Sequence, residues 1–179
     1  QIIGDLYGNV ERANAFEWRR TVNRLNQKVD KKEWGMTPPT INAYYSPTKN
    51  GIVFPAALLQ PPFFDPNADP AVNYGAIGGV IGHEMGHGFD DQGAKSDAQG
   101  VLRDWWNAED TTRFTALGDR LVAQYNGFEA LPGLNVNGRL TLGENIGDNG
   151  GLQVALRAYE LSLNGADAPV LDGMTGTQR

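Results

Sequence analysis

The only two histidines of this chain lie four residues apart, in the run Val80-Ile81-Gly82-His83-Glu84-Met85-Gly86-His87. At 3.6 residues per turn, a helix projects the side chains of His83 and His87 from one face, about 40° apart. Glu84 follows His83 by about 100° and flanks the same face. Two neutral imidazoles suit zinc, and the intervening carboxylate suits a general base. The run predicts a metal-binding helix; the alternative is an ordinary helix with a partly exposed histidine pair.

The third ligand must be a carboxylate, because a zinc hydrolase needs three protein ligands and the sequence holds no further His and no Cys. Downstream, Glu144 and Asp148 lie four residues apart, so a helix would point both to one side. We predict that Glu144 completes the ligand set. Asp148 would then accept a hydrogen bond from the non-ligating nitrogen of a histidine. A capping box is the alternative, since Thr141 precedes Glu144 by three residues.

Three motifs follow one another along the chain. The first is Asn42-Ala43-Tyr44-Tyr45-Ser46-Pro47, the second is the histidine run continued as Gly88-Phe89-Asp90-Asp91, and the third is Glu144-Asn145-Ile146-Gly147-Asp148-Asn149-Gly150-Gly151. Together with segments 53–56, 60–64 and 104–106, they resemble the catalytic domain of the neprilysin family of zinc endopeptidases over about residues 38–159. Three motifs in order are far more specific than the histidine run alone.

The resemblance implies a role for each residue of the metal site. One Zn²⁺ would be bound by His83, His87 and Glu144. Glu84 would be the catalytic base that takes a proton from the zinc-bound water, and Asp148 would support catalysis by orienting a histidine.

The resemblance also implies how a peptide binds. Asn42 and the carbonyl of Ala43 would hold the substrate backbone as an added edge strand. The pocket for the residue after the scissile bond would be lined by Leu58, Phe63 and Val80. Because this pocket accepts large apolar side chains, the expected function is hydrolysis of small peptides with a hydrophobic residue at that position.

Family members continue past Arg179 with a His and an Arg that contact the reacting peptide, and they carry a large helical N-terminal part. We therefore expect a C-terminally truncated fragment of a catalytic domain, with peptides and the missing segments of the parent enzyme as its partners. Two alternatives remain: a zinc-binding but catalytically inactive fragment, and a structural or interaction domain without metal.

Composition narrows the partners and the setting. A net charge of −6 without a basic stripe argues against nucleic acid. No apolar stretch is long enough to cross a bilayer, so no membrane segment is expected in this chain. The absence of cysteine favours a bacterial parent, because eukaryotic relatives are disulfide-linked. The resemblance places that parent outside the cytoplasm, as a periplasmic, secreted or membrane-anchored enzyme.

The expected fold is α+β, mainly helical and of the thermolysin-like zinc peptidase type. Helices are predicted at about 9–31, 72–88, 105–125 and 141–163, the second carrying the histidines and the fourth Glu144. Strands at 40–46 and 51–54 form an edge hairpin, and Asn137-Gly138 marks a second candidate hairpin. Residues 1–179 belong to one catalytic domain, with an N-terminal helix region at 1–37, a metal-site core at 38–165 and a cut linker at 166–179.

Glycines recur inside the predicted histidine helix, each costing up to about 1 kcal/mol relative to Ala: Gly75, Gly78, Gly79, Gly82 and Gly86. Tertiary packing must therefore hold this helix, and we expect it to be the buried centre of the domain, closely approached by a neighbouring backbone. After the helix, the spacing of Asp90, Asp91 and Asp97 does not fit a calcium loop. We expect Asp90 or Asp91 to support a histidine or to end the helix.

Overall fold

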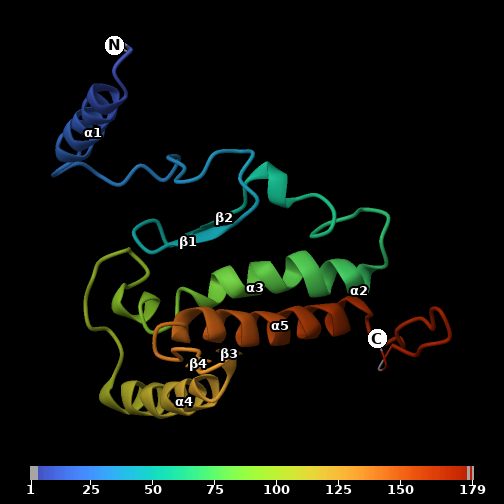
Figure 1. Ribbon diagram of the computed structural model, residues 1–179. Coiled ribbons are helices and arrows are strands. Elements are labelled where there is room, and N and C mark those ends of the chain that lie inside the picture. The colour runs from blue at the N-terminus through green and yellow to red at the C-terminus, as the bar shows by residue number, and fades with distance from the viewer. Residues whose placement is uncertain (1–3, 177, 179) are drawn as a thin grey trace. The chain divides into compact units, whose positions relative to one another are not determined.

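The computed structural model describes residues 4–176 and 178. Over these residues it is mainly helical with two small antiparallel sheets, which confirms the predicted α+β class (Figure 1). The chain divides into two compact units between Lys32 and Glu33. Within the part that the structure describes, no helix is both long and apolar enough to cross a membrane.

The first unit contains helix α1, Leu6–Val22. The Asp5 carboxylate caps its N-terminus by accepting a hydrogen bond from the Gly8 N–H at 3.0 Å. This helix was predicted to extend to about Lys31, and that extent is wrong. Turns follow Val22, and Asn26 adopts a φ of 64°, a conformation that a right-handed helix cannot continue.

In the second unit the histidine helix runs without a break through three segments: α2 (Pro70–Asn73), a π-helical turn η2 (Tyr74–Gly78) and α3 (Gly79–Gly86). Asp69 begins it by accepting a hydrogen bond from the Ala71 N–H at 3.3 Å, with Pro70 in the first turn. The predicted helix at 72–88 is therefore confirmed. The π-helical turn was not foreseen, since no simple sequence pattern encodes it.

Helix α5, Leu142–Ser162, lies alongside α3 (Figure 1). A Cβ on Gly82 would lie 2.7 Å from the Gly151 Cα, and one on Gly86 would lie 3.3 Å from the Gly147 Cα. The two backbones are thus in direct contact, as the glycines predicted. This close contact brings the first turn of α5, with Glu144, beside the histidines.

Replacing Gly151 with Ala is expected to lower the free energy of unfolding by about 1–3 kcal/mol, the usual cost of overpacking. The new Cβ would lie 2.5 Å from the His83 backbone nitrogen, so α5 would have to move away from α3. Gly150→Ala is the matched control, because a Cβ there meets nothing within 4 Å and Ala favours a helix. Urea unfolding of both variants checks this. Equal stabilities would contradict the close contact.

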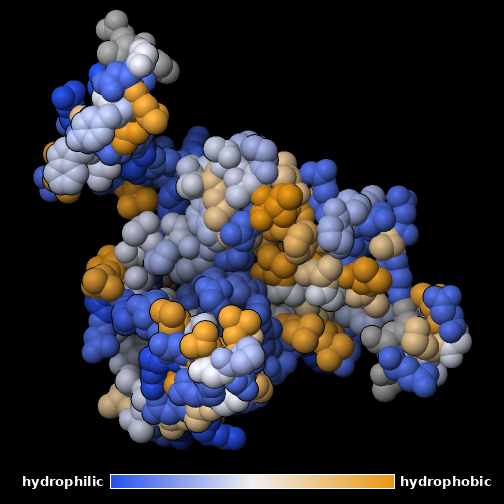
Figure 2. All heavy atoms as spheres, viewed as in Figure 1, coloured by the Kyte–Doolittle hydropathy of each residue, from blue (hydrophilic) through white to orange (hydrophobic). Residues whose placement is uncertain are grey.

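Helix α3 contacts both α5 and the edge hairpin, but part of its surface stays exposed, so the predicted burial of this helix is incomplete. Gly82 and Glu84 are buried, whereas Ile81 and Met85 are exposed. Figure 2 shows hydrophobic side chains also exposed over α2 and α5. The exposed hydrophobic residues of these two helices include Val72, Leu152, Val154, Leu156 and Leu161. The contacts of α3 are with α5 and the edge hairpin, which leave its outer face open.

The edge hairpin pairs β1 (Tyr44–Ser46) with β2 (Gly51–Val53), Tyr45 lying opposite Ile52. Both strands were predicted, although the first is shorter than 40–46. A hydrophobic cluster joins this hairpin to the histidine helix. Its buried members are Ala43, Leu58 of the short helix η1 (Ala56–Leu58) and Ile77, and its partly buried members are Phe54, Phe63, Phe64 and Val80. The packing of this cluster places β1 beside α3.

The remaining elements are η3 (Gly93–Lys95), helix α4 (Ala108–Asn126) and a second hairpin of β3 (Glu129–Leu131) and β4 (Leu134–Asn135). Asn107 caps α4 by accepting a hydrogen bond from the Asp110 N–H. The hairpin turn lies at Pro132-Gly133, with φ of 76° at Gly133, and not at Asn137-Gly138 as predicted. Asn137 instead leads into α5, because its backbone carbonyl accepts a hydrogen bond from the Thr141 N–H.

Candidate metal centre

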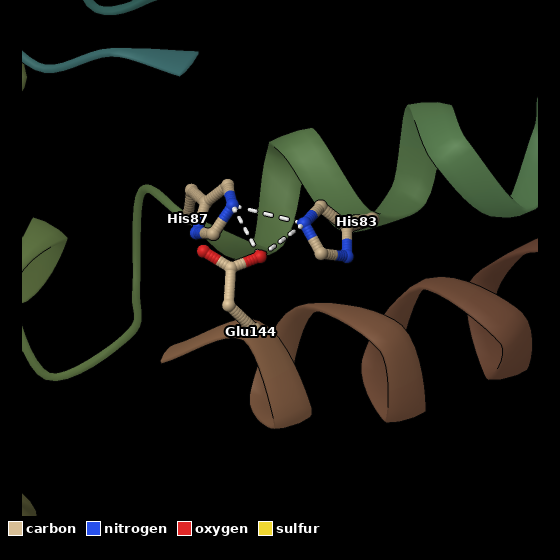
Figure 3. Close-up of side chains that lie close together, drawn as sticks. All are labelled: His83, His87 and Glu144. Atoms are coloured by element: carbon tan, nitrogen blue, oxygen red, sulfur yellow. Dashed lines mark hydrogen bonds and ion pairs between the residues drawn. The ribbon is translucent and has the colours of Figure 1, made fainter. Parts of the chain in front are cut away.

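His83, His87 and Glu144 bring their ligand atoms together, all within 4.8 Å of one another (Figure 3). His83 Nε2 and His87 Nε2 are 2.9 Å apart, and Glu144 Oε2 lies 3.3 Å from the first and 3.8 Å from the second. A tetrahedral zinc ion with bonds of about 2.0–2.1 Å would hold its ligand atoms about 3.3–3.4 Å apart. The observed distances lie on both sides of this value, so the three groups fit a zinc ion.

The other nitrogen of each imidazole contacts a carboxylate. His83 Nδ1 lies 2.7 Å from Asp148 Oδ1, and His87 Nδ1 lies 2.7 Å from Asp90 Oδ2. Because an ionised carboxylate only accepts hydrogen bonds, each Nδ1 carries the proton, and each imidazole in its neutral form presents a lone pair at Nε2. Two lone pairs and the Glu144 carboxylate then face one another and repel unless a cation lies between them. This donor set is suited to a divalent metal ion.

Asp90 is the more rigid of the two carboxylates that contact the histidines. It is 4% exposed, and its second oxygen accepts hydrogen bonds from the Gln92 and Gly93 N–H groups at 2.8 and 2.7 Å. Burial lowers the pKa of His87, but the hydrogen bond and the charge of Asp90 raise it, and the net pKa is above the ordinary value. Asp90 and Asp91 were both expected as residues that support a histidine. Asp90 contacts His87, whereas Asp91 accepts a hydrogen bond from the Gln92 side chain.

The capping box considered for Glu144 and the role of Asp97 after the histidine helix can both be compared with this geometry. Thr141 is the N-cap residue of α5, yet its side chain makes no capping hydrogen bond. Its hydroxyl donates to the Asn137 carbonyl at 3.3 Å and accepts from the Asn145 side chain at 2.9 Å. Glu144 is therefore not part of a capping box. Asp97 accepts hydrogen bonds from the Gln99 and Val101 N–H groups, so it holds a turn of the loop that follows the histidine helix.

Replacing Asp148 with Ala is expected to weaken zinc binding by about 10- to 100-fold, because His83 loses the group that holds its tautomer and orientation. Asp148→Asn should cost less, since the amide oxygen still accepts the hydrogen bond. Competition titration against a chromophoric chelator measures both affinities. If Asp148→Ala binds zinc as tightly as the unmodified chain, Asp148 does not orient His83.

Glu84 lies beside this centre without belonging to the converging ligand atoms. It is 5% exposed, and its Oε2 is buried with no hydrogen-bond partner among the described residues. Burial has the largest effect on the pKa of Glu84 and raises it above its ordinary value, whereas the two histidines and a hydrogen bond from the Tyr45 backbone lower it. A buried carboxylate with a raised pKa is a better proton acceptor than an exposed one.

Two clefts meet at the metal centre. The larger has a volume of about 850 Å³ and lies between β1, the histidine helix and residues 137–144. The smaller, of about 530 Å³, lies between the histidine helix and α5. The residues that line both are Asn42, His83, Glu84 and Glu144. A long ligand can therefore extend to both sides of the metal centre.

The residues predicted to bind substrate fall into two groups. Asn42, Ala43 and Val80 line the clefts, and Asn42 Oδ1 accepts a hydrogen bond from the Ala43 N–H at 2.9 Å. Leu58 and Phe63 lie behind them in the hydrophobic cluster, where Leu58 is only 2% exposed. Their contact with a substrate side chain stays a prediction. The larger cleft also contains Tyr45 and Arg139, to which the sequence interpretation gave no role.

Comparison with known proteins adds independent evidence. Residues 42–179 match the model of Peptidase family M13. Human endothelin-converting enzyme 1 is 48% identical over 98% of this chain and 23% of its own length, and neprilysin-3 of Drosophila melanogaster is 47% identical over 87% and 20%. The crystal structure of the Mycobacterium tuberculosis zinc metalloprotease Zmp1 with an inhibitor shares 58% identity and a TM-score of 0.89, covering 97% of this chain and 27% of that one. This chain thus spans about a quarter of the length of these relatives.

Proposed function

This chain belongs to peptidase family M13, the neprilysin family, and we propose that it carries the metal centre and the general base of a zinc endopeptidase. The observation that carries the proposal is the convergence of His83 Nε2, His87 Nε2 and the Glu144 carboxylate where two clefts meet. Both imidazoles are held for ligation by carboxylates on their opposite nitrogens.

The chemistry assigns a separate task to each group. When bound by His83, His87 and Glu144, Zn²⁺ would polarise a water molecule and the peptide carbonyl. Glu84 would take the proton from that water and pass it to the leaving amine, a role that suits its burial and raised pKa. Asn42 and the Ala43 carbonyl would hold the peptide backbone beside β1. Because clefts extend on both sides of the centre, a peptide could be cut within its length.

We further propose a preference for a hydrophobic residue after the scissile bond. The smaller cleft supports this, since Ala76, Val80 and Leu152 line it and the hydrophobic cluster with Leu58 and Phe63 lies behind. Peptides that differ only at this position, with Leu, Phe, Gly or Asp, test the preference. Equal kcat/KM for Leu and Asp would contradict it.

A second candidate function is zinc binding without turnover. It is favoured by the exposure of the Glu144 and Asp148 side chains, 68% and 77%, which leaves the centre open to water. Elemental analysis and turnover of a short peptide, with and without a chelator, separate the candidates. One zinc per chain with chelator-sensitive cleavage supports the peptidase, and zinc without cleavage supports the second candidate. Absence of zinc would exclude both.

The proposed partners are peptides and the remaining parts of a longer parent enzyme, because the relatives are about four times as long as this chain. We also propose that the parent enzyme acts outside the cytoplasm, as the family resemblance suggested. Cell fractionation with an antibody against this chain tests the location. Signal confined to the cytoplasm would contradict it.

A further inference from the structure

Tyr45, in the middle of β1, contacts three parts of the proposed active site. Its backbone hydrogen-bonds the Glu84 carboxylate. Its ring lies against the chain just after the histidine helix, where a Cβ on Gly88 would be 3.5 Å from the ring. Its hydroxyl donates a hydrogen bond to the Asn50 side-chain oxygen at 3.0 Å. One residue therefore connects the general base, the end of the histidine helix and the turn of the edge hairpin.

Asn50 extends this connection to a second loop. Its side-chain nitrogen donates a hydrogen bond to the Ala98 carbonyl at 3.2 Å. Asn50 also adopts a φ of 44°, a left-handed conformation that Asn tolerates better than most residues. Ala98 belongs to the loop at residues 96–102. This loop is held by the Asp97 carboxylate, which accepts hydrogen bonds from two backbone N–H groups and pairs with Arg103 at 2.5 Å.

Strand β1 needs such an anchor. It has three residues and, within the described chain, pairs only with β2. A two-stranded hairpin is marginally stable by itself. Under the proposed function, β1 must receive a peptide along its free edge and hold its own backbone against Glu84. The hydrophobic cluster fixes the chain at Ala43, just before the strand, whereas the Tyr45 hydroxyl and Asn50 act at the middle of the strand and at the turn of the hairpin.

We propose that Tyr45 is a positioning residue of the peptidase: its hydroxyl, through Asn50 and Ala98, fixes β1 so that Glu84 and the Ala43 carbonyl keep their places beside the metal centre. This inference rests on the proposed function. It concerns the side chains of Tyr45 and Asn50, which are not among the three residues that could hold the metal.

Two variants remove the connection at different points. Tyr45→Phe deletes only the hydroxyl. Asn50→Gly deletes the bridging side chain and keeps the left-handed backbone, which glycine adopts without strain. Tyr125→Phe on α4 is the matched control, since it deletes the same atom outside both clefts. Circular dichroism and zinc content verify that each variant folds and binds the metal.

Two measurements follow. Amide hydrogen exchange of the zinc-bound chain should show faster exchange at residues 44–46 in both variants and unchanged exchange in α5. Steady-state kinetics should show kcat lower by roughly tenfold with KM little changed, a smaller loss than the about 10²-fold that a 1 Å misplacement can cost. The double variant should lose no more than either single one, because both break the same connection.

The outcomes are distinct. Wild-type kcat in a variant with faster exchange shows that fixing β1 does not serve catalysis, and overturns the inference. Additive losses in the double variant show that the two side chains act separately, and also overturn it. If the unmodified zinc-bound chain has no turnover, the proposed function fails and the inference fails with it. Unchanged exchange at 44–46 in an active enzyme removes the inference and leaves the proposed function standing.

Discussion

Replacing Glu84 with Gln is expected to lower peptide turnover by about 10²–10⁴-fold, the usual contribution of general acid–base catalysis, while zinc binding is retained. Glu84 lies beside the three ligand atoms and is not one of them, so its charge is not needed for coordination. Gln has nearly the same shape and still accepts the hydrogen bond from the Tyr45 backbone. The buried site should therefore keep its packing and lose only its proton acceptor.

Zinc content, a circular dichroism spectrum and kcat/KM for one peptide are the required measurements. Glu109→Gln is a suitable control, because it makes the same change on an exposed residue of α4. Glu84→Asp should retain part of the activity, since a base remains but is set back by one methylene group. If Glu84→Gln cleaves the peptide as fast as the unmodified protein, another group is the base.

Replacing Glu144 with Gln is expected to weaken zinc binding by more than about 100-fold. The loss should exceed the about 10- to 100-fold that follows from removing a group outside the ligand shell, because Glu144 is proposed to bind the metal directly. No other carboxylate among the described residues forms a three-ligand group with the two histidines. Its position in the first turn of α5 also favours the negative charge that Gln lacks.

Competition titration with a chromophoric chelator measures this affinity, and thermal unfolding with and without zinc gives an independent reading. Glu160→Gln, at the other end of the same helix, controls for the loss of one charge from α5. Equal zinc affinity for Glu144→Gln and the unmodified chain would show that the third ligand has been assigned incorrectly.

Much of the site could be predicted because its geometry is local. The four-residue spacing of His83 and His87 places both on one helical face in any helix. The same argument holds for Glu144 and Asp148 on α5, and the family motifs connected the two pairs. The cap of α4 is local in the same sense, since Asn107 acts on a backbone N–H within the next turn.

Predictions failed where residues distant in the sequence decide the outcome. Asn137-Gly138 has the composition of a hairpin turn. A Cβ on Gly138 would lie 2.4 Å from the Val122 carbonyl of α4, so packing against α4 decides the conformation of this segment. The exposed outer face of α3 could not be foreseen either. The glycines of the helix indicate a close neighbour, but they do not say how many sides of the helix it covers.

The sequence by itself determined which residues can hold the metal, because helical periodicity and the chemistry of imidazole and carboxylate leave few choices. Only the tertiary structure decided that the two ligand-bearing helices lie close enough to share one ion. That distance is set by backbone contact at Gly82 with Gly151 and at Gly86 with Gly147. The tertiary structure also decided that Asp90, and not Asp91, contacts His87, since the path of the chain after the helix turns one carboxylate toward the imidazole. Such contacts depend on packing between distant segments, which no local pattern specifies.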